Sequence, residues 1–344
     1  MIKMKKKDLQ ILEIYAQNCR IPHTTIGKML RVSKDTVSYT VRNLEKKGYL
    51  KQYMLFIDAR KLGFTRFHLL MKFSAGAPKQ ELIKIMQKHP FVMWINTFIG
   101  RYDIQVIVDA QNSFHLNTIR EELFEQCHHA IHEYSILTHL CDLEFTNIIP
   151  TIDTGILIDE QIERSSKTSV TTKRFSVAME FTHYAPAVID LEILRLLAND
   201  PQASIVDMAL TLHTNRQTIT EHLVNLIEHK IILNTSGIVD PSKFCYVTYY
   251  FLVRLVQDTP LAVMKKLFLK LNNIFYAGRM IGDYDMILYL NARNPQELNV
   301  SSELLTQELG NYLSHYELLV QDKVHHWRQY TPGIYETLKK RNEK

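Results

Sequence analysis

The stretch "GRYDIQVIV" begins at Gly100, and the stretch "GDYDMILYL" begins at Gly282, 182 positions later. Each places Gly-x-Tyr-Asp in front of a short apolar run. This pattern is typical of a tight turn that leads into a buried strand. The recurrence of the same pattern at a long, fixed spacing indicates that the unit around it is written twice.

The rest of the chain repeats at the same spacing. Matching pairs include Asp8/Asp190, Leu9/Leu191, Ile11/Ile193, Leu12/Leu194, Asn43/Asn225, Leu44/Leu226, Asp58/Asp240, Pro78/Pro260, Asn112/Asn294, Leu116/Leu298, Asn117/Asn299 and Tyr134/Tyr316. The register holds without a gap over about 130 residues, far longer than a solenoid element. We therefore interpret the chain as a tandem duplication of one two-part unit.

Composition narrows the class of protein. The 344 residues are 46% hydrophobic and 22% charged, as in a globular protein, and no apolar run reaches the ~18 residues of a membrane span. The four cysteines are scattered without a Cys-x-x-Cys pair. The histidines around residues 128–132 fall in an expected loop rather than on one helical face. We therefore expect a cytoplasmic protein without a signal segment, structural metal or cofactor.

The charge is unevenly distributed. Residues 1–62 hold 14 Lys and Arg against 5 Asp and Glu, a net charge of +9. Residues 185–245, the matching part of the second copy, hold 4 against 7, a net charge of −3. A small domain at +9 indicates a polyanionic partner, and a solubilising surface is the alternative interpretation.

The first part of each copy predicts a winged helix-turn-helix. Helical spacing over residues 8–16 and 24–30 precedes a third helix, which Ser33 caps and Gly48 ends. Residues 49–53 and 54–57 are expected to form two short strands of a wing. Val37, Val41 and Leu44 recur on one side of the third helix, so the opposite side faces outward.

That outward side carries the candidate DNA-binding residues. A third helix of this kind enters the major groove, where side chains contact bases and phosphates. The candidates are Lys34, Ser38, Tyr39, Arg42 and Lys46, with Lys5, Lys6 and Lys7 ahead of the first helix as backbone contacts. In the second copy the third helix has Glu221, Val224 and Glu228 in place of Tyr39, Arg42 and Lys46. We expect the second copy to bind DNA weakly or not at all, because carboxylates repel phosphates.

The second part of each copy reads as strand–helix–strand–strand–helix–strand, a ferredoxin-like βαββαβ domain. The expected fold class is therefore α+β. The expected divisions are a basic winged helix over 1–62, a βαββαβ domain over 63–148, a linker over 149–184, an acidic winged helix over 185–245, a second βαββαβ domain over 246–330 and a tail over 331–344. Within the linker, residues 173–181 alternate weakly, as an edge strand would.

The combination resembles the Lrp/AsnC (feast/famine) transcription regulators. The resemblance rests on Ser33-x-x-Thr36-Val37 and Leu44-Glu45-x-x-Gly48, followed by a βαββαβ (RAM) domain with Gly-x-Tyr-Asp between its second and third strands. It implies promoter DNA as partner, homo-oligomers, and an intramolecular pseudo-dimer of the two copies. The chain departs from the family pattern at Thr40 and His222, where arginine is common, and at Lys230, which replaces the glycine at Gly48.

The resemblance also implies a small-molecule effector such as an amino acid. In the family the Gly-x-Tyr-Asp turn borders the effector cleft, which makes Gly100, Tyr102, Asp103, Gly282, Tyr284 and Asp285 the candidate ligand neighbours. The alternative is purely structural: glycine allows a positive φ, and the aspartate caps its own turn.

Two other functions stay open. Sirohaem decarboxylases have an Lrp/AsnC-like fold and an Arg-Pro-x-Trp-Pro-Tyr-Asn type segment, and here the same region, FVMWINTFIGRYD from Phe91, has Trp94 but neither Arg-Pro nor Trp-Pro. A sensor or scaffold that has lost DNA binding is the other alternative. Because no nucleophile motif or Gly-rich phosphate loop is visible, we expect a transcription regulator and not an enzyme.

Overall fold

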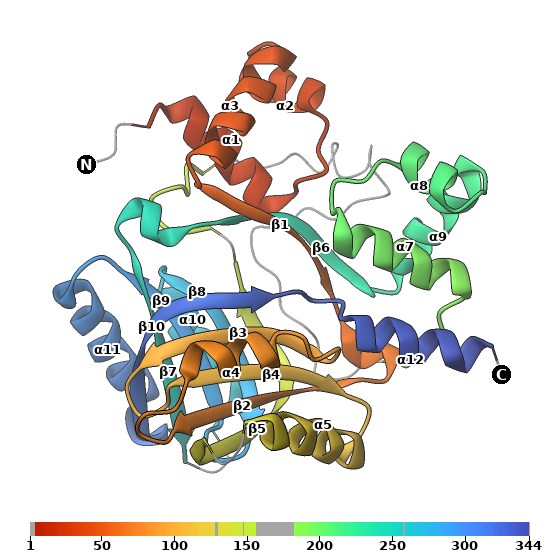
Figure 1. Ribbon diagram of the computed structural model, residues 1–344. Coiled ribbons are helices and arrows are strands. Elements are labelled where there is room, and N and C mark those ends of the chain that lie inside the picture. Colours follow the sequence, from red (N-terminus) through yellow and green to blue (C-terminus); the bar gives the residue numbers. More distant parts are fainter. Residues whose placement is uncertain (1–3, 128–129, 147, 156–181, 257–258, 344) are drawn as a thin grey trace.

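The computed structural model describes residues 4–127, 130–146, 148–155, 182–256 and 259–343 (Figure 1). The expected edge strand over 173–181 lies outside these residues. The elements of the first copy are α1 (Lys6–Gln17), α2 (His23–Leu30), α3 (Lys34–Lys46), β1 (Leu50–Ile57), η1 (Ala59–Leu62), β2 (Thr65–Phe73), α4 (Lys79–Met86), β3 (Val92–Ile99), β4 (Ile104–Ala110), α5 (Ser113–Gln126) and β5 (Ile131–Phe145).

The second copy repeats this order. Its elements are α7 (Val188–Asn199), α8 (Ile205–Thr211), α9 (Arg216–Glu228), β6 (Ile232–Val239), η2 (Pro241–Phe244), β7 (Val247–Leu255), α10 (Leu261–Lys270), β8 (Ile274–Ile281), β9 (Met286–Ala292), α11 (Pro295–Leu309) and β10 (Leu313–Trp327). Each begins 182 positions after its counterpart in the first copy. The duplication and the α+β fold class are therefore confirmed.

The expected two-strand wing is a single strand that pairs with the other copy. β1 and β6 form an antiparallel two-stranded ribbon, in which Met54 lies opposite Ser236. These two residues are equivalent in the duplication, so a pseudo-two-fold axis passes between them. The prediction of two short strands was wrong because the partner of residues 50–57 is not the neighbouring segment but a segment 182 positions away.

The βαββαβ domains join edge to edge into a closed eight-stranded barrel. Its order is β10-β3-β4-β2-β5-β8-β9-β7. The two joints between the copies are equivalent: β5 pairs with β8 from Thr138 opposite Ile281, and β10 pairs with β3 from Val320 opposite Ile99. Closure leaves no unpaired edge in the barrel, which removes the exposed strand edges that isolated sheets carry.

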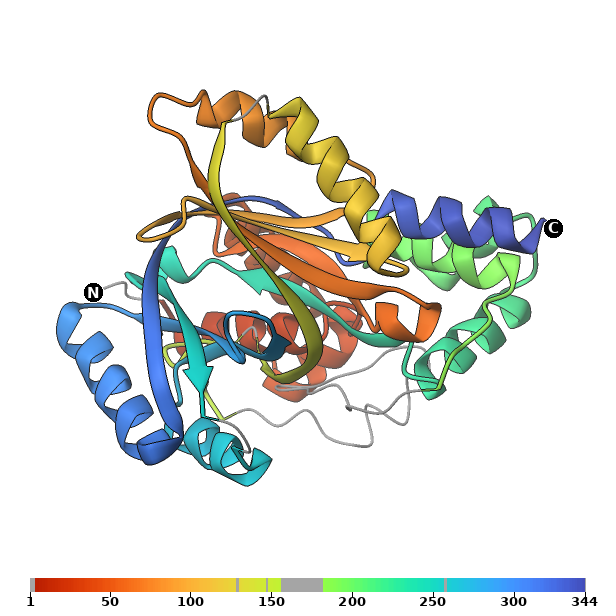
Figure 2. The ribbon, with the colours of Figure 1, turned by 90° about the horizontal axis from the view of Figure 1, so that it is seen from below.

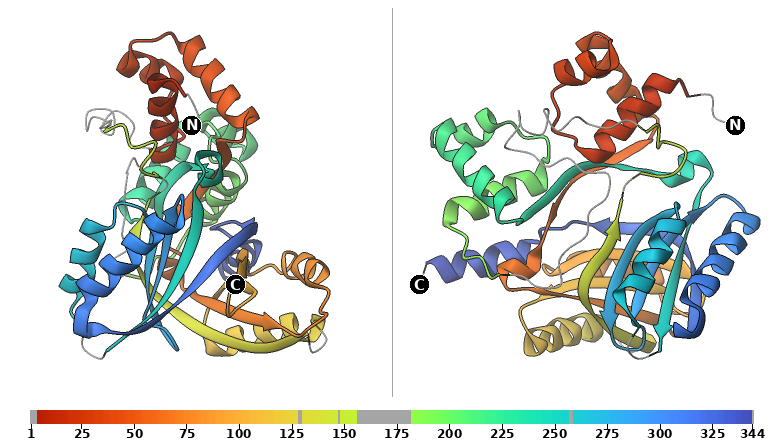
Figure 3. Two further views of the ribbon diagram at one scale, coloured as in Figure 1. Left: turned by 90° about the vertical axis from the view of Figure 1, so that its left-hand side faces the viewer. Right: turned by 180° about the vertical axis from the view of Figure 1, so that it is seen from behind.

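Helices cover the outside of the barrel and aromatic side chains fill its inside. Figure 2 shows α4 and α5 along one side and α10 and α11 along the other. The inward-facing core includes Tyr102, Tyr250, Tyr284 and Tyr289, and the ribbon adds Met54 and Phe56 to it. We call the helices α1–α3 the first head and α7–α9 the second head. Figure 3 shows both heads on the same side of the barrel, with the ribbon of β1 and β6 between them.

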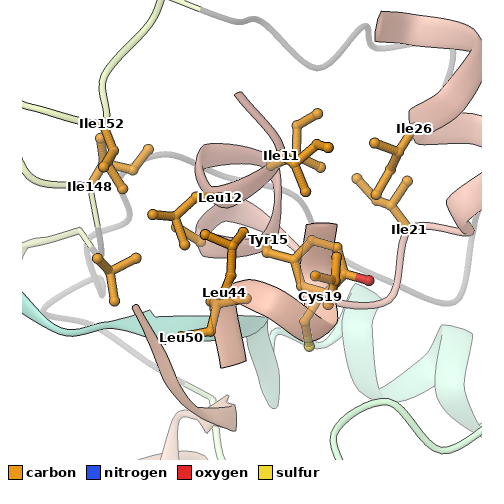
Figure 4. Close-up of a cluster of buried hydrophobic side chains, with 14 of the residues drawn as sticks. Ile11, Leu12, Tyr15, Cys19, Ile21, Ile26, Leu44, Leu50, Ile148 and Ile152 are labelled. Atoms are coloured by element: carbon orange, nitrogen blue, oxygen red, sulfur yellow. The ribbon is translucent and has the colours of Figure 1, made fainter. Parts of the chain in front are cut away.

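Each head packs against the C-terminal end of the ribbon strand that the other copy contributes. The core around α1 includes Val239 and Phe244 of the second copy (Figure 4 shows part of this core). The core around α7 includes Ile57 and Leu62 of the first copy. The heads, the ribbon and the barrel therefore form one connected structure.

The segments after β5 and β10 differ from the linker and tail that the sequence predicts. Ile149 and Ile152, in the expected linker, are buried in the core around α1, where Figure 4 shows Ile152. Residues of the expected tail form α12 (Pro332–Asn342), whose Ile334 and Leu338 are buried against the second head. Thr331 caps this helix and Pro332 occupies its first turn, which is a readable start signal that the sequence interpretation missed.

No helix in the described part of the chain has the length and apolar character needed to cross a membrane.

A substitution at Gly282 tests how closely this turn approaches β5 of the first copy. Its φ is +145°, and an added Cβ would lie 2.7 Å from Leu137 Cδ2 and 2.9 Å from the Ile136 carbonyl oxygen. We expect Gly282→Ala to lower the free energy of unfolding by about 2–3 kcal/mol, because backbone strain and overpacking add. Gly76→Ala is the matched control, since Gly76 also has a positive φ but no atom within 4 Å. Equal losses of thermal stability in the two variants would contradict this account.

Candidate nucleic-acid interface

Helix α3 forms because local sequence signals agree. The Ser33 side chain accepts a hydrogen bond from the Thr36 backbone nitrogen at 3.0 Å, which satisfies one of the free donors at the helix start. Val37, Val41 and Leu44 are buried on the inner side, as their spacing predicts. The outer side of the helix is thereby left to solvent.

The structure brings five of the candidate DNA contacts together on this outer side. Lys34, Arg42 and Lys46 are exposed, and the Tyr39 side chain is 70% exposed. Ser38 is half-buried between them along the helix. We call these five residues the reading face of α3.

The positive field of this face acts on a neighbouring histidine. Burial is the main cause that lowers the pKa of His23, and the charges of Lys34 and Arg42 lower it further. The His23 ring lies 2.6 Å from the Tyr15 hydroxyl, at the base of the head. Cations that disfavour a nearby positive charge favour a nearby phosphate for the same electrostatic reason.

Three candidate residues lie on another element. Lys5 is the N-cap residue of α1, and Lys6 and Lys7 begin that helix; all three are exposed. They belong to the same head as the reading face but do not share its helix. Thr40, at the position where the family commonly has arginine, is only 7% exposed and faces inward. Arg42 is the arginine that this helix presents to solvent.

The second head keeps the geometry of the first but changes its chemistry. Asn215 caps α9 by accepting a hydrogen bond from the Thr218 backbone nitrogen at 2.8 Å. Lys230, at the position of Gly48, keeps a positive φ of 54°. The backbone conformation at the end of the helix therefore survives without the glycine.

The outward side of α9 is acidic and partly engaged. Glu221 and Glu228 are exposed, and Glu221 accepts a hydrogen bond from Gln217 at 2.7 Å. His222, at the other position where the family has arginine, binds the buried Asp190 at 2.7 Å. Of the three cations of the reading face, only Lys34 has a cationic counterpart, Arg216; Val224 replaces Arg42 and Glu228 replaces Lys46.

The two heads touch each other directly. Arg20 donates hydrogen bonds to the carbonyl oxygens of Pro201 and Ala203 at 3.1 and 2.8 Å. Gln202, the counterpart of Arg20, donates to the Cys19 carbonyl oxygen at 3.3 Å. These contacts fix the spacing of the two heads, and the sequence gives no signal for them because the partners are 181 to 183 positions apart.

The Gly-x-Tyr-Asp turns lie at the joints of the barrel. Gly100 and Gly282 have φ of +148° and +145°, which confirms the expected positive φ. Gly100 lies against Leu319 in β10, so this turn contacts the opposite copy as the Gly282 turn does. Tyr102 and Tyr284 are both buried.

The residues between glycine and tyrosine also connect the two copies. Arg101 forms ion pairs with Glu133 at 2.9 Å and with Glu317. Asp283 accepts a hydrogen bond from the Ser135 hydroxyl at 2.6 Å. The motif that repeats in the sequence therefore carries much of the contact between the repeats.

The aspartates of the motif do not cap their own turns. Asp103 accepts hydrogen bonds from the Phe73 backbone nitrogen at 2.9 Å and from Lys79 at 2.8 Å. Asp285 likewise accepts from the Leu255 backbone nitrogen at 2.8 Å. Each carboxylate fixes the end of a neighbouring strand, β2 or β7. The role of the six motif residues as ligand neighbours stays a prediction.

Within the described ranges, no three or more His, Cys, Asp and Glu side chains gather in a way that could hold a metal ion. His128 and His129 lie outside the described residues.

The chain is similar in sequence to transcription regulators. A family model described as "Winged helix-turn-helix DNA-binding" matches residues 4–51, which cover the first head. The HTH-type transcriptional regulator LysM of Saccharolobus solfataricus is 30% identical over 118 residues, covering 34% of this chain and 82% of LysM. LysM of Sulfurisphaera tokodaii is 29% identical over 123 residues, covering 36% of this chain and 86% of LysM.

The whole chain matches another kind of protein in fold. The siroheme decarboxylase NirDL superposes with a TM-score of 0.58 at 13% identity, covering 99% of this chain and 100% of NirDL. Its complex with an iron-uroporphyrin III analogue superposes with a TM-score of 0.59 at 14% identity, covering 98% and 99% of the two chains. At this identity the likeness concerns the fold.

This match corrects one expectation from the sequence. The chain was expected not to be an enzyme, and two solved structures that match it over 98 to 99% of its length are those of an enzyme. The absence of a catalytic motif failed as an argument because the two-copy fold itself is shared with a decarboxylase.

The caps of α3 and α9 provide a matched pair of variants. We expect Ser33→Ala and Asn215→Ala each to lower the free energy of unfolding by about 1 kcal/mol, because each removes the acceptor of a helix-start donor. Only Ser33→Ala should also weaken binding to DNA, since it loosens the reading face. Thermal melts and fluorescence anisotropy with labelled duplex DNA measure the two effects. A similar loss of DNA affinity in both variants would contradict the assignment of the interface to α3.

Proposed function

The chain belongs to the Lrp/AsnC family of DNA-binding transcriptional regulators, and from this premise we propose that it recognises specific duplex sites mainly through α3. In this proposal Ser38, Tyr39 and Arg42 contact base edges in the major groove, and Lys34 and Lys46 contact phosphates. Lys5, Lys6 and Lys7 add contacts to the sugar-phosphate backbone.

The observation that carries the proposal is the contrast between two equivalent helices. α3 presents Lys34, Arg42 and Lys46 to solvent, whereas the equivalent positions of α9 hold Arg216, Val224 and Glu228, and Glu221 adds a second exposed carboxylate. Neutralising phosphates requires cations, and carboxylates at the same distance repel them. We propose that the second head contributes spacing and packing, and binds DNA weakly or not at all.

Arginine substitutions in the two heads test this asymmetry. We expect Arg42→Ala to weaken binding to a selected operator by about 1–3 kcal/mol, because it removes a base or phosphate contact. Arg216→Ala removes the arginine of α9, which stands at the position of Lys34, and should leave the affinity nearly unchanged. Gel shifts over a range of salt concentrations measure both the affinity and the number of phosphates neutralised.

Two outcomes of that experiment count against the proposal. Equal losses in Arg42→Ala and Arg216→Ala would reject the asymmetry between the heads. If the affinity of the unaltered protein for DNA does not change with salt concentration, binding through the basic face is rejected. Neutralisation of phosphates makes the affinity fall as the salt concentration rises.

We further propose that two chains associate, so that two reading faces meet a palindromic site. A chain with one DNA-binding head contacts only a half-site. A dimer with two-fold symmetry contacts both halves of a palindromic site. A small effector such as an amino acid, near Gly100, Tyr102, Asp103 and their counterparts, and a cytoplasmic location complete the proposal. The location is supported by the DNA partner and by Cys19, Cys127, Cys141 and Cys245, all of which are free thiols.

A second candidate function is tetrapyrrole decarboxylation of the kind performed by NirDL. The observation that favours it is the match in fold over the whole chain, at a TM-score of 0.58. The region around Trp94 lacks the Arg-Pro and Trp-Pro of the segment expected in sirohaem decarboxylases, so the substrate contacts would differ.

An absorption spectrum tests the second candidate. The purified protein is mixed with iron uroporphyrin III, and visible bands are recorded after free pigment is removed. Stoichiometric retention with shifted bands, followed by release of carbon dioxide from sirohaem, is the result expected of the enzyme. Pigment that elutes entirely apart from the protein would reject this function.

A further inference from the structure

A cleft lies between the ribbon and one side of the barrel. Its volume is about 250 Å³. Lys51 and Gln52 of β1 and Val239 of β6 line the ribbon side, and Thr248, Val324 and Trp327 line the barrel side. This size is close to the lower end of small-molecule pockets, which suits a ligand of about one or two rings.

The duplication places an equivalent position on the other side of the pseudo-two-fold axis, and there the space is filled. Two small cavities on that side measure about 30 and 20 Å³. Arg66 stands where the open side has Thr248, and Asp142 stands where it has Val324. Two large charged side chains therefore occupy the volume that two small ones leave free.

The filling side chains are fixed by buried ion pairs. Arg66 binds Asp109 at 3.0 Å, and Asp142 binds His139 at 3.0 Å. Burial raises the pKa of Asp142, but His139 and Arg66 outweigh it and hold the pKa at about 2, so the carboxylate stays charged. On the open side the Arg66–Asp109 pair is replaced by a short hydrogen bond of 2.9 Å between Thr248 and Asn291. The two sides therefore differ at equivalent positions of the duplication.

The walls of the open cleft are flat and aromatic. Trp94 and Trp327 stack with ring centroids 4.5 Å apart and planes within 12°. The indole nitrogen of each is buried and meets no acceptor among the described residues. Because both nitrogens are shielded, the two tryptophans offer ring surface and not a hydrogen-bond donor to the cleft. Trp94 is only 6% exposed, so water reaches it poorly.

The charged residues at the opening of the cleft favour a ligand with an acidic group. Lys51 is exposed there and forms no ion pair with a described residue. Asp240, the acidic residue of the lining, already accepts hydrogen bonds from the backbone nitrogen and hydroxyl of Ser242 at 3.0 and 2.7 Å. Burial, with Arg328 beside it, lowers the pKa of His326 to about 4, so this ring is neutral near pH 7.

We propose that the open cleft binds a small, flat aromatic molecule with an acidic group, and that the duplicated chain has one such site. The rings lie against Trp94 and Trp327, and the acidic group meets Lys51. The ribbon that covers the cleft begins at Leu50, four residues after α3 ends at Lys46, so a bound ligand shifts the position of the reading face. This regulatory step rests on the proposed DNA-binding function, whereas the ligand site does not.

The two tryptophans of the cleft make its occupancy measurable, because the sequence contains only two. The full-length protein is titrated with 1-anilinonaphthalene-8-sulfonate, a flat aromatic anion, and with N-phenyl-1-naphthylamine, its neutral analogue. We expect saturable quenching of tryptophan emission with one sulfonate probe per chain. Lys51→Ala should lower the affinity for the anionic probe and leave the affinity for the neutral probe unchanged.

Filling the open side tests the location of the site. Thr248→Arg with Val324→Asp introduces the residues of the filled side, and we expect roughly tenfold or greater loss of probe affinity because charged groups take the ligand's volume. Val300→Asp with Thr306→Arg makes the same exchanges at exposed positions of α11 and should bind as the unaltered protein does. If the filled variant does not fold, Trp327→Phe replaces it, with an expected loss of several-fold because the smaller ring offers less surface for stacking.

The outcomes separate the two proposals. Probe affinity unchanged by both the filling substitutions and Trp327→Phe, or two equivalent sites per chain, would overturn the ligand site. DNA affinity that shifts by about fivefold or more at saturating probe supports the regulatory step, and an unchanged DNA affinity overturns it. If the unaltered protein binds the probe in the cleft but binds no DNA, the proposed function and the regulatory step fail while the ligand site stands.

Discussion

Strand pairing between the two copies is the constraint on which the rest of the structure depends. Neither βαββαβ sheet closes by itself, because β3 and β5 of the first copy pair with β10 and β8 of the second. An unpaired backbone donor or acceptor in an apolar setting is costly, so each copy needs the other to complete its hydrogen bonding. The ribbon of β1 and β6 applies the same rule a second time, above the barrel.

This arrangement links the heads to the barrel and to each other. Each head packs against the end of the ribbon strand that the opposite copy contributes, so the ribbon connects the two heads. The hydrogen bonds of Arg20 and Gln202 between the heads reinforce that link. A change at the ribbon therefore reaches α3 through packed side chains, which is the physical basis for regulation from beneath it.

A duplication inside one chain also frees the two copies to diverge. In a symmetric dimer every substitution appears twice, so a filled cleft would be filled on both sides and an acidic helix would appear in both heads. Here Arg66 and Thr248 occupy equivalent places, as do Arg42 and Val224. The chain keeps cations on one head and open volume on one side of the barrel, and it uses the equivalent places for packing and ion pairs.

The sequence by itself determined the local features: the 182-residue repeat, the starts of α3 and α9 at Ser33 and Asn215, and the cationic side of α3. These follow from helix periodicity, capping and charge, which act over a few neighbouring residues. The tertiary structure alone decided that residues 50–57 pair across the axis, that Asp103 and Asp285 fix neighbouring strands, and that Arg66 and Asp142 close one cleft. Their partners lie tens to hundreds of positions away, and no local pattern specifies which distant side chain a strand edge or a buried charge will meet.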